Sequence, residues 1–275
     1  MAARQELHIL VFGAHPDDCD VKAGGVGAKY VQQGYYVRFV SLTNGDAGHH
    51  EIGGIELAQR RRAEAEAAGR VIGVDYQVLD NHDGELLPTL EHRRQVIRII
   101  REVQPDLIMA PRPNDYHPDH RYTSQLVQDA AYMVTVPNIV TLTEHLRRNP
   151  VIVYVSDSFR KPYPFTPDVA VGIDDVIEQK LDMLHCHTSQ MYEWLPYNAG
   201  MLEHVPQAER ERRAWLAERR LPGFQSIADR YRDLLIKLYG HERGRRIQYA
   251  EAFEACEYGS ALTPEHIPVL FPFFD

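Results

Sequence analysis

The sequence has few cysteines and no long apolar run, and each of these absences excludes a class of protein. Its three cysteines, Cys19, Cys186 and Cys256, are an odd number spread along 275 residues, which is no disulfide framework and fits a reducing compartment. No stretch approaches the roughly 18 apolar residues of a membrane span. The apolar run at residues 9–12 is too short for a secretory signal. We therefore expect a cytoplasmic protein without an integral membrane segment.

The charge balance excludes a further class, the proteins that bind nucleic acid. Lys and Arg number 30 against 39 Asp and Glu, which gives a net charge of -9. No run of Lys or Arg is long enough to neutralise the phosphates of a nucleic acid, so we expect no such partner. The hydrophobic fraction of 44% is ordinary for a globular chain, and the length favours one elaborated α/β domain.

Strand and helix patterns alternate along the first half of the chain. Strands are predicted at residues 7–13, 35–42, 76–79 and 106–110, and helices at 24–33, 56–72, 90–103 and from 118 onward. This alternation is typical of a Rossmann-like, three-layer α/β/α fold with a mainly parallel sheet. Further on, strands are predicted at 151–155 and 169–172, and helices at 173–187, 208–220 and 223–238.

The first chemical motif follows the first predicted strand and reads AHPDDCD over residues 14–20. An imidazole and a carboxylate three residues apart, His15 and Asp18, can reach one divalent metal while the adjacent Asp17 stays free. A turn with a helix-capping Asp is the simpler alternative. A histidine and three acids within six residues are nevertheless unusual for a turn alone.

The second motif follows the fourth predicted strand and reads NDYHPDH over residues 114–120. His117 and His120, near the start of a helix, can face one site and add a second nitrogen ligand. A capped helix start is the alternative. In a doubly wound sheet the first and fourth strands are neighbours, and ligands bind outside their carboxyl ends. Two His and one Asp there leave a position open for water, as in catalytic zinc sites.

Together the two motifs resemble those of the PIG-L/LmbE family of metal-dependent N-deacetylases, which act on N-acetylglucosamine-type amides. Further matches are Arg61 and Glu64 as R-x-x-E, DGEL at 83–86 and H-x-S-Q at 187–190. The resemblance implies a single PIG-L/LmbE-like domain over residues 1–275. Its motif-bearing core would be residues 1–190, and residues 191–275 would be a helix-rich C-terminal extension that matches no motif.

The resemblance also implies roles for individual residues. His15, Asp18 and His120 would hold the metal, either Zn²⁺ or Fe²⁺, because a His₂Asp site with an open position accepts both. Asp17 would be the general base that takes a proton from metal-activated water. His117 would stabilise the oxyanion and protonate the leaving amine. Candidate substrate contacts are Arg61, Asp83, Asp115 and His187. The chain departs from the family pattern at one position, residue 20, which is Asp where the family more often has Glu. Because its side chain is one methylene shorter, it reaches less far toward the metal ligands and the backbone around them.

Other polar and aromatic residues have simpler explanations. Arg60 and Arg62 fit a solvated helix face, and an Asp-Gly turn explains Asp83 equally well. The Gly-rich loop at 44–54 fits a mobile lid, although its His49 and His50 are more simply exposed to solvent. Some aromatic residues can either stack on a sugar or belong to the core or an interface: Tyr116, Tyr192 and Trp194. The alternating Arg and Glu residues at 209–220 fit a salt-bridged outer helix.

The expected function is a zinc-dependent hydrolase that removes acetyl from a small N-acetylglucosamine-type conjugate by metal-activated water. An amidase for a larger N-acyl group or a thiol conjugate is the first alternative. A Rossmann-type nucleotide-binding enzyme is disfavoured, because the carboxylates of AHPDD would repel a pyrophosphate. A sugar-binding module is disfavoured because Asp17 and His117 are both present. The oligomeric state is left open, and a homo-oligomer with an interface from the C-terminal part is one option.

Overall fold

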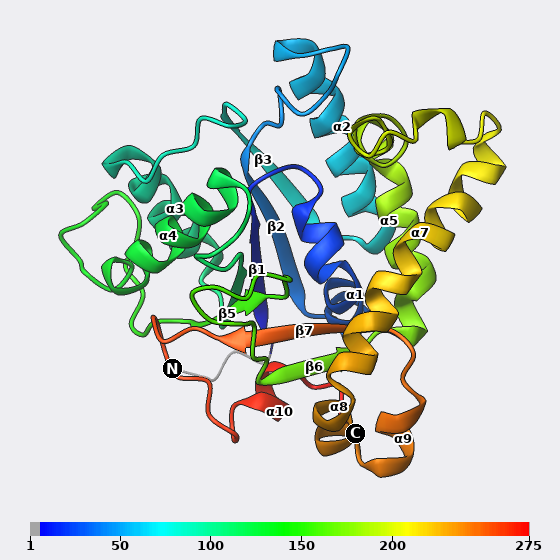
Figure 1. Cartoon of the computed structure of the whole chain (residues 1–275). Helices are drawn as coiled ribbons and strands as arrows, with labels where there is room; N and C mark the ends of the chain where they lie inside the picture. Colours follow the sequence, from blue (N-terminus) through cyan, green and yellow to red (C-terminus); the bar gives the residue numbers. More distant parts are fainter. Residues whose placement is uncertain (1–5, 275) are drawn as a thin grey trace.

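One seven-stranded sheet forms the centre of a computed structural model of the chain, which describes residues 6–274 (Figure 1). The strand order is β3-β2-β1-β4-β5-β7-β6. The strands are β1 (His8–Gly13), β2 (Tyr36–Thr43), β3 (Asp75–Asn81), β4 (Leu107–Ala110), β5 (Val151–Val155), β6 (Val169–Gly172) and β7 (Ala250–Ala255). The first five pair in parallel, and β7 lies antiparallel between β5 and β6. The predicted Rossmann-like, mainly parallel sheet is confirmed.

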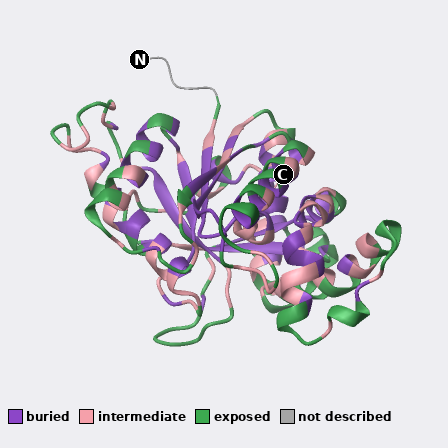
Figure 2. Cartoon of the chain, turned by 90° about the horizontal axis from the view of Figure 1, so that it is seen from above, coloured by how far each residue is buried: buried purple, intermediate pink, exposed green. Residues whose placement is uncertain are grey.

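Helices cover both faces of this sheet. On one face lie α1 (Asp18–Gln32), α2 (Gly54–Ile72), α5 (Ile177–Cys186) and α7 (Glu209–Arg230), and on the other α3 (Leu90–Val103) and α4 (Pro118–Met133) (Figure 1). Shorter helices are η1 (Asp174–Val176), η2 (Ser189–Trp194), α6 (Leu195–Asn198), η3 (Leu202–His204), α8 (Arg232–Tyr239), α9 (His241–Arg246) and α10 (Ile267–Leu270). Seen from above, the buried strands lie between outer helices that carry the exposed residues (Figure 2). None of the described helices is long and apolar enough to cross a membrane.

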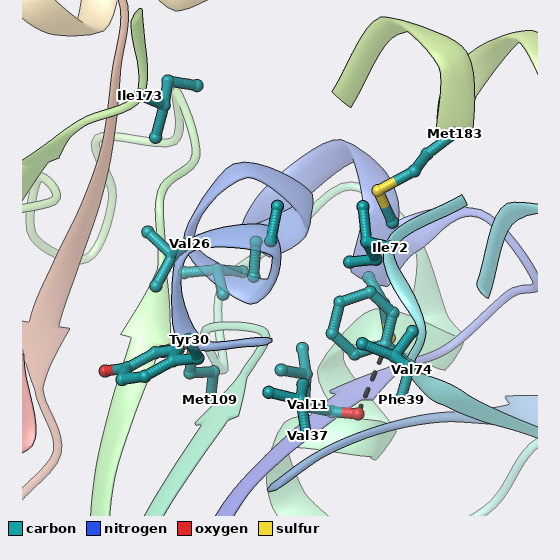
Figure 3. Packing of buried hydrophobic residues seen from close by; sticks show 14 of the residues in the cluster. Val11, Val26, Tyr30, Val37, Phe39, Ile72, Val74, Met109, Ile173 and Met183 are labelled. Carbon is teal, nitrogen blue, oxygen red and sulfur yellow. Dashed lines mark hydrogen bonds between the residues drawn. The ribbon is translucent and has the colours of Figure 1, made fainter. Parts of the chain in front are cut away.

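The central strands are apolar on both faces because both faces are covered. In β1, Val11 packs in the cluster on the α1 face, while Leu10 and Phe12 pack in the cluster on the α3 and α4 face. Figure 3 shows Val26 and Tyr30 of α1 in the first of these clusters, together with residues of β1, β2 and β4. The alternation of side chains across a strand therefore explains the continuous apolar run of the sequence.

A glycine lets α1 approach a buried ion pair. The N–H of Gly25 donates to Oε1 of Glu251 over 2.9 Å, and Lys180 bonds the same carboxylate. A Cβ on Gly25 would lie 2.8 Å from Cγ2 of Ile173, so no larger residue fits without a shift. Because an unpaired buried charge is costly, this pair fixes the position of α1, whose first residue is Asp18.

Two helices have clearly different bounds from the predicted ones, and one strand was missed. Helix α1 begins at Asp18 rather than at residue 24, so the end of the AHPDDCD motif lies in its first turn. Helix α7 continues through Pro222, where a break was predicted, because buried Leu216 and Phe224 anchor it on both sides. Strand β7 was missed because Glu251 interrupts its apolar pattern. Through β7 the C-terminal part belongs to the same sheet as the motif-bearing part.

Candidate metal centre and cleft

The two predicted motifs meet at the carboxyl ends of β1 and β4, which are neighbours in the sheet. His15 lies in the tight turn after β1, where its carbonyl accepts the N–H of Asp17 over 2.8 Å. Asp18 opens α1, and its Oδ2 accepts the N–H of His15 over 2.8 Å. His117 caps α4, and His120 lies in the first turn of that helix. Short connections after two adjacent strands therefore bring together residues about 100 positions apart.

Three of these side chains form a compact triangle. Nδ1 of His15 lies 3.5 Å from Oδ2 of Asp18, and Nε2 of His120 lies 3.2 Å from the first atom and 3.3 Å from the second. Ligand atoms about 2.1 Å from a tetrahedral zinc ion are roughly 3.4 Å apart, so this donor set fits such an ion. Asp115 bonds Nδ1 of His120 over 2.9 Å, which leaves Nε2 directed into the triangle, as carboxylates beside metal-bound histidines do.

A second group of potential ligands lies on the other side of the His15 ring and comprises His15, Asp83, His117 and Asp119. Nε2 of His15 lies 3.1 Å from Asp83 and 3.4 Å from Asp119. Nδ1 of His117, however, accepts the backbone N–H of Asp119 over 3.2 Å. Because a neutral ring nitrogen has a single lone pair, that atom is not free to bind a metal. The triangle of His15, Asp18 and His120 is therefore the better fit.

The electrostatics of the triangle favour positive charge at its centre. Burial lowers the pKa of His120, but the charge of Asp18 and hydrogen bonds with Asp115 and Asp18 outweigh it and raise this pKa to about 9. Burial likewise opposes charge on His15, yet hydrogen bonds with Asp119, Asp18 and Asp83 raise its pKa well above the usual value. The carboxylates that stabilise these protonated rings would equally stabilise a divalent cation.

His117 differs from the other two histidines. Burial lowers its pKa, and the nearby His15 and His120 lower it further. Its Nδ1 already accepts a backbone N–H at the start of α4, so in the neutral ring the proton lies on Nε2. His117 lines the cleft described below, where it can donate a hydrogen bond from Nε2.

Asp17 is held outside the triangle by Arg61. The guanidinium donates from Nη2 to Oδ1 of Asp17 over 3.0 Å and from Nη1 to the carbonyl of Gly45 over 3.2 Å. Gly45 has a φ of +72°, and a Cβ there would lie 2.5 Å from Nη1 of Arg61. Nη1 also lies 3.6 Å from Oδ2 of Asp83. The buried Arg61 thus orients two acids at once, beside the potential metal site.

These residues open into a cleft of about 320 Å³. A cleft of this size accommodates a small molecule. Of the predicted site residues, the cleft is lined by His15, Asp17, Asp18, Arg61, Asp83 and His117. Asp115 lies behind His120 instead. His187 is fully buried, and its Nε2 bonds Oδ2 of Asp20 over 2.9 Å, so it does not reach the cleft.

The opposite side of the cleft includes Ala47 and Gly48 of the Gly-rich loop predicted as a lid, together with Leu195 and Asn198, which the sequence did not single out. Trp194 and Gln190 also line it. Among the residues considered for sugar stacking, Tyr116 is 70% exposed at the rim, whereas Tyr192 is buried in the core. Leu195 and Asn198 belong to no recognised motif, so only the fold places them beside this loop.

The Gly-rich loop at 44–54 is tied to this wall by a network that we call the Glu193 clamp, formed by Glu193, Arg60 and His49. Oε2 of Glu193 lies 2.9 Å from Nε2 of His49 and accepts Nη1 of Arg60 over 2.8 Å. Gln190 donates to the carbonyl of Gly48 over 3.0 Å. The interpretation of His49 as exposed was wrong, because its side chain is only 2% exposed. Arg60 is 32% exposed and so stays partly solvated, but it also pairs with an acid distant in sequence.

The R-x-x-E and H-x-S-Q patterns meet in a second set of contacts. Glu64 of α2 accepts the hydroxyl of Ser189 over 2.6 Å and its backbone N–H over 2.9 Å. Gln190 follows directly and reaches the cleft. These contacts join α2 to η2, so Glu64 supports the far wall of the cleft, while Arg61 on the same helix reaches the acids.

The chain is similar to several known proteins. The family described as PIG-L, GlcNAc-PI de-N-acetylase, matches residues 10–131. The chain is 32% identical over 200 residues to a diacetylchitobiose deacetylase of Thermococcus kodakarensis, covering 69% of this chain and 74% of the relative. It is 25% identical over 209 residues to a 4-oxalmesaconate hydratase of Pseudomonas putida, covering 73% and 81%.

Among solved structures, the N,N'-diacetylchitobiose deacetylase from Pyrococcus horikoshii superimposes with a TM-score of 0.69 at 27% identity, covering 90% of this chain and 83% of that one. The matched residues 10–131 contain both motifs of the metal triangle. We conclude that the chain belongs to the PIG-L family of de-N-acetylases.

Proposed function

We propose that this chain is a metal-dependent N-deacetylase that removes acetyl from a small N-acetylglucosamine-type conjugate. One observation carries the proposal: Asp17, outside the His15, Asp18 and His120 triangle, lines the same cleft as two of those three side chains. A potential three-ligand centre with a separate, oriented carboxylate beside it is the arrangement that hydrolysis of an amide by water requires.

His15, Asp18 and His120 would hold the ion, either Zn²⁺ or Fe²⁺. When bound, the ion supplies Lewis acidity, which makes water more acidic and the amide carbonyl more electrophilic at neutral pH. Asp115 would keep the His120 ring in the orientation that presents Nε2 to the ion, through its 2.9 Å bond to Nδ1.

The chain's own groups would move the protons. Asp17, held by Arg61, takes a proton from the attacking water as the C–O bond forms at the amide carbon. His117 donates a hydrogen bond from Nε2 to the carbonyl oxygen, where negative charge develops. The proton on Asp17 then passes to the amide nitrogen as the C–N bond breaks, which releases acetate and the free amine. Asp83, at the cleft wall, would accept hydrogen bonds from sugar hydroxyls.

In this proposal His117 stabilises the oxyanion, as the family resemblance implies, but as a hydrogen-bond donor and not as the acid that protonates the leaving amine. A doubly protonated ring would place a proton on Nδ1, against the N–H of Asp119 that this nitrogen accepts over 3.2 Å. The neutral ring avoids this clash between two donors. It still presents one N–H to the cleft.

Acetate release is the measurement that tests the proposal. The protein would be stripped by a chelator, reloaded with Zn²⁺ or Fe²⁺, and assayed with N-acetylglucosamine, N,N'-diacetylchitobiose and neutral N-acetylglucosaminides. We expect acetate from at least one conjugate with the loaded protein and none with the stripped protein.

Two controls separate the alternatives. Longer N-acyl analogues and thiol conjugates test the wider amidase activity, and 4-oxalmesaconate tests the water addition named for one relative. Hydration of 4-oxalmesaconate without any acetate release, or acyl release confined to the longer acyl groups, would refute the deacetylase. Acetate release that survives complete removal of the metal would refute the role of the triangle.

A further inference from the structure

Two arginines near the middle of α7, Arg219 and Arg220, line a pocket without an acidic partner among the described residues. Arg213, on the same helix, bonds Asp182 over 2.6 Å and Glu178 over 2.7 Å. Within the described residues 6–274, no carboxylate lies within 4.0 Å of Arg219 or Arg220. The predicted salt-bridged outer helix is therefore only partly correct.

Arg219 and Arg220 line a second pocket, which shares Leu195 with the cleft. The rest of its lining is largely apolar and includes Met191, Trp215 and Leu216. The guanidinium of Arg219 lies 4.9 Å from the centre of the Trp215 ring. Two guanidinium groups in a largely apolar lining give this pocket a positive charge, and neither of them is in an ion pair with a carboxylate of the described chain.

The contacts of the two guanidinium groups are weak. Nη2 of Arg220 lies 2.9 Å from the sulfur of Met191, and Nη2 of Arg219 lies 2.9 Å from the sulfur of Met201. A thioether is a poor acceptor, whereas a guanidinium has five N–H donors that match the paired oxygens of a carboxylate or phosphate. Most of their hydrogen-bonding capacity is thus available to a ligand.

Arg220 is only partly exposed, and its surroundings penalise its charge. Burial lowers its pKa; the charge of Asp17 opposes this and that of Arg219 adds to it. A charge withdrawn from water without a counter-ion is unfavourable. An anion bound between the two arginines would offset that cost, and the same anion would be held by two charge-assisted contacts.

The pocket is also close to the site of the proposed reaction. Leu195 lines both the cleft and the pocket, and Asp17, the proposed base, is near enough for its charge to act on Arg220. A molecule whose acetamido group lies beside Asp17 can therefore extend over Leu195 toward the arginines. This continuity favours a group of the substrate itself over an unrelated ion.

We propose that Arg219 and Arg220 bind an anionic group, a carboxylate or phosphate, carried by the part of the substrate beyond the N-acetyl sugar. The inference rests on the proposed deacetylase for the sugar end of that molecule. It narrows the substrate class to N-acetylglucosamine conjugates with an acidic aglycone. Neutral conjugates would be turned over less efficiently, because they leave the two guanidinium groups without an anion.

The test uses matched pairs of N-acetylglucosaminides whose aglycone ends in a carboxylate or in the corresponding primary amide, on spacers of one to four carbons. The quantity measured is the ratio of kcat/KM for acid over amide. We expect a ratio above ten for at least one spacer in the native protein, and at least a tenfold fall in that ratio in Arg219→Gln/Arg220→Gln. Arg210→Gln, an exposed arginine of the same helix, should keep the native ratio.

Several results would overturn the inference. One is a ratio near one for every spacer in the native protein, which needs no variant. Another is an acid-over-amide ratio that stays at its native value in the double variant. If the double variant does not fold, a native ratio in the single variant Arg219→Gln, at an exposed position, would have the same meaning. Two charge-assisted contacts are strong enough for their loss to be visible in either variant.

A binding measurement separates this inference from the proposed reaction. If no conjugate releases acetate, the deacetylase fails, and calorimetry then compares binding of the carboxylate-bearing glucosaminides by the native protein and the double variant. Tighter binding of acids than of amides, lost in the variant, would still support the pocket. Inorganic phosphate that binds as tightly as the conjugates would show a site for free anions and refute the assignment to the substrate.

Discussion

The two walls of the cleft are built in different ways. One wall comes from short turns directly after β1 and β4 and carries the histidines and acids of the potential metal centre. The other comes from the loop after β2 and from η2 and α6, and it consists mainly of glycine, alanine, amide and aromatic side chains. The first wall is rich in ionisable groups, whereas the second is shaped by backbone and ring surfaces.

This difference separates chemistry from selectivity. Ionisable groups at strand ends are positioned by the sheet itself, which tolerates little change. The second wall is positioned by side-chain contacts between distant segments, such as the Glu193 clamp. We therefore expect substitutions on the first wall to abolish turnover or metal binding, and substitutions on the second to change substrate affinity.

The largest effect is expected from Asp17→Asn. The amide cannot take a proton from water, so kcat should fall by on the order of 100-fold or more. Metal content should stay native, because Asp17 lies outside the triangle. Steady-state acetate release and elemental analysis measure the two quantities. Asp233→Asn, an exposed acid on α8, is the matched control, and native turnover in Asp17→Asn would disprove the assignment of the base.

Metal affinity should distinguish the two overlapping groups of potential ligands. His120→Ala removes a corner of the triangle and should abolish stoichiometric metal binding, while Asp119→Asn in the second group should retain it. Asp115→Asn should weaken metal affinity by roughly 10–100-fold, because it loosens the orientation of His120. Titration with Zn²⁺ in competition with a chelator gives these affinities. Loss of metal in Asp119→Asn but not in His120→Ala would reverse the choice between the groups.

The difference between the two walls of the cleft also explains which features could be predicted from the sequence. The order of strands and helices and the meeting of the two motifs follow from apolar patterns and from the rule that parallel strands end at one edge. The burial of His187 against Asp20 and the pairing of Arg60 with Glu193 do not follow, because no rule of sheet topology places α5 against α1 or η2 against α2. Strand β7 was also not predicted, because the charge of Glu251 interrupts its apolar pattern and is paired with Lys180 only in the folded chain.

On the second wall, Trp194→Ala should raise KM with little change in kcat. An aromatic ring against a sugar face or another ring contributes about 0.5–1.5 kcal/mol, so we expect a rise of roughly twofold to tenfold. Trp194→Phe keeps a ring and should recover most of the affinity. The measurement is KM and kcat on whichever conjugate releases acetate. A fall in kcat with constant KM would mean that Trp194 acts in the chemical step. It would contradict the assignment of catalysis to the first wall and of substrate affinity to the second.

The smallest effect concerns the Glu193 clamp and its dependence on pH. Burial alone would raise the pKa of Glu193, but hydrogen bonds from Arg60 and His49 outweigh it and hold this pKa below its usual value. A carboxylate with a lowered pKa in the folded state stabilises fully above the unfolded value of about 4.5, and that stability is lost as the pH falls through the folded pKa.

Because the clamp is partly exposed to solvent, its contribution should be under about 1 kcal/mol. Glu193→Gln should therefore lower the free energy of unfolding slightly at pH 6, and the difference from the native protein should shrink on going toward pH 4. Glu203→Gln, an exposed glutamate of η3, controls for the change of net charge. Denaturant unfolding at the two pH values measures the difference, and amide exchange in the loop at 44–54 should quicken in the variant. A difference that grows toward pH 4 would mean that the charge of Glu193 does not hold this wall in place.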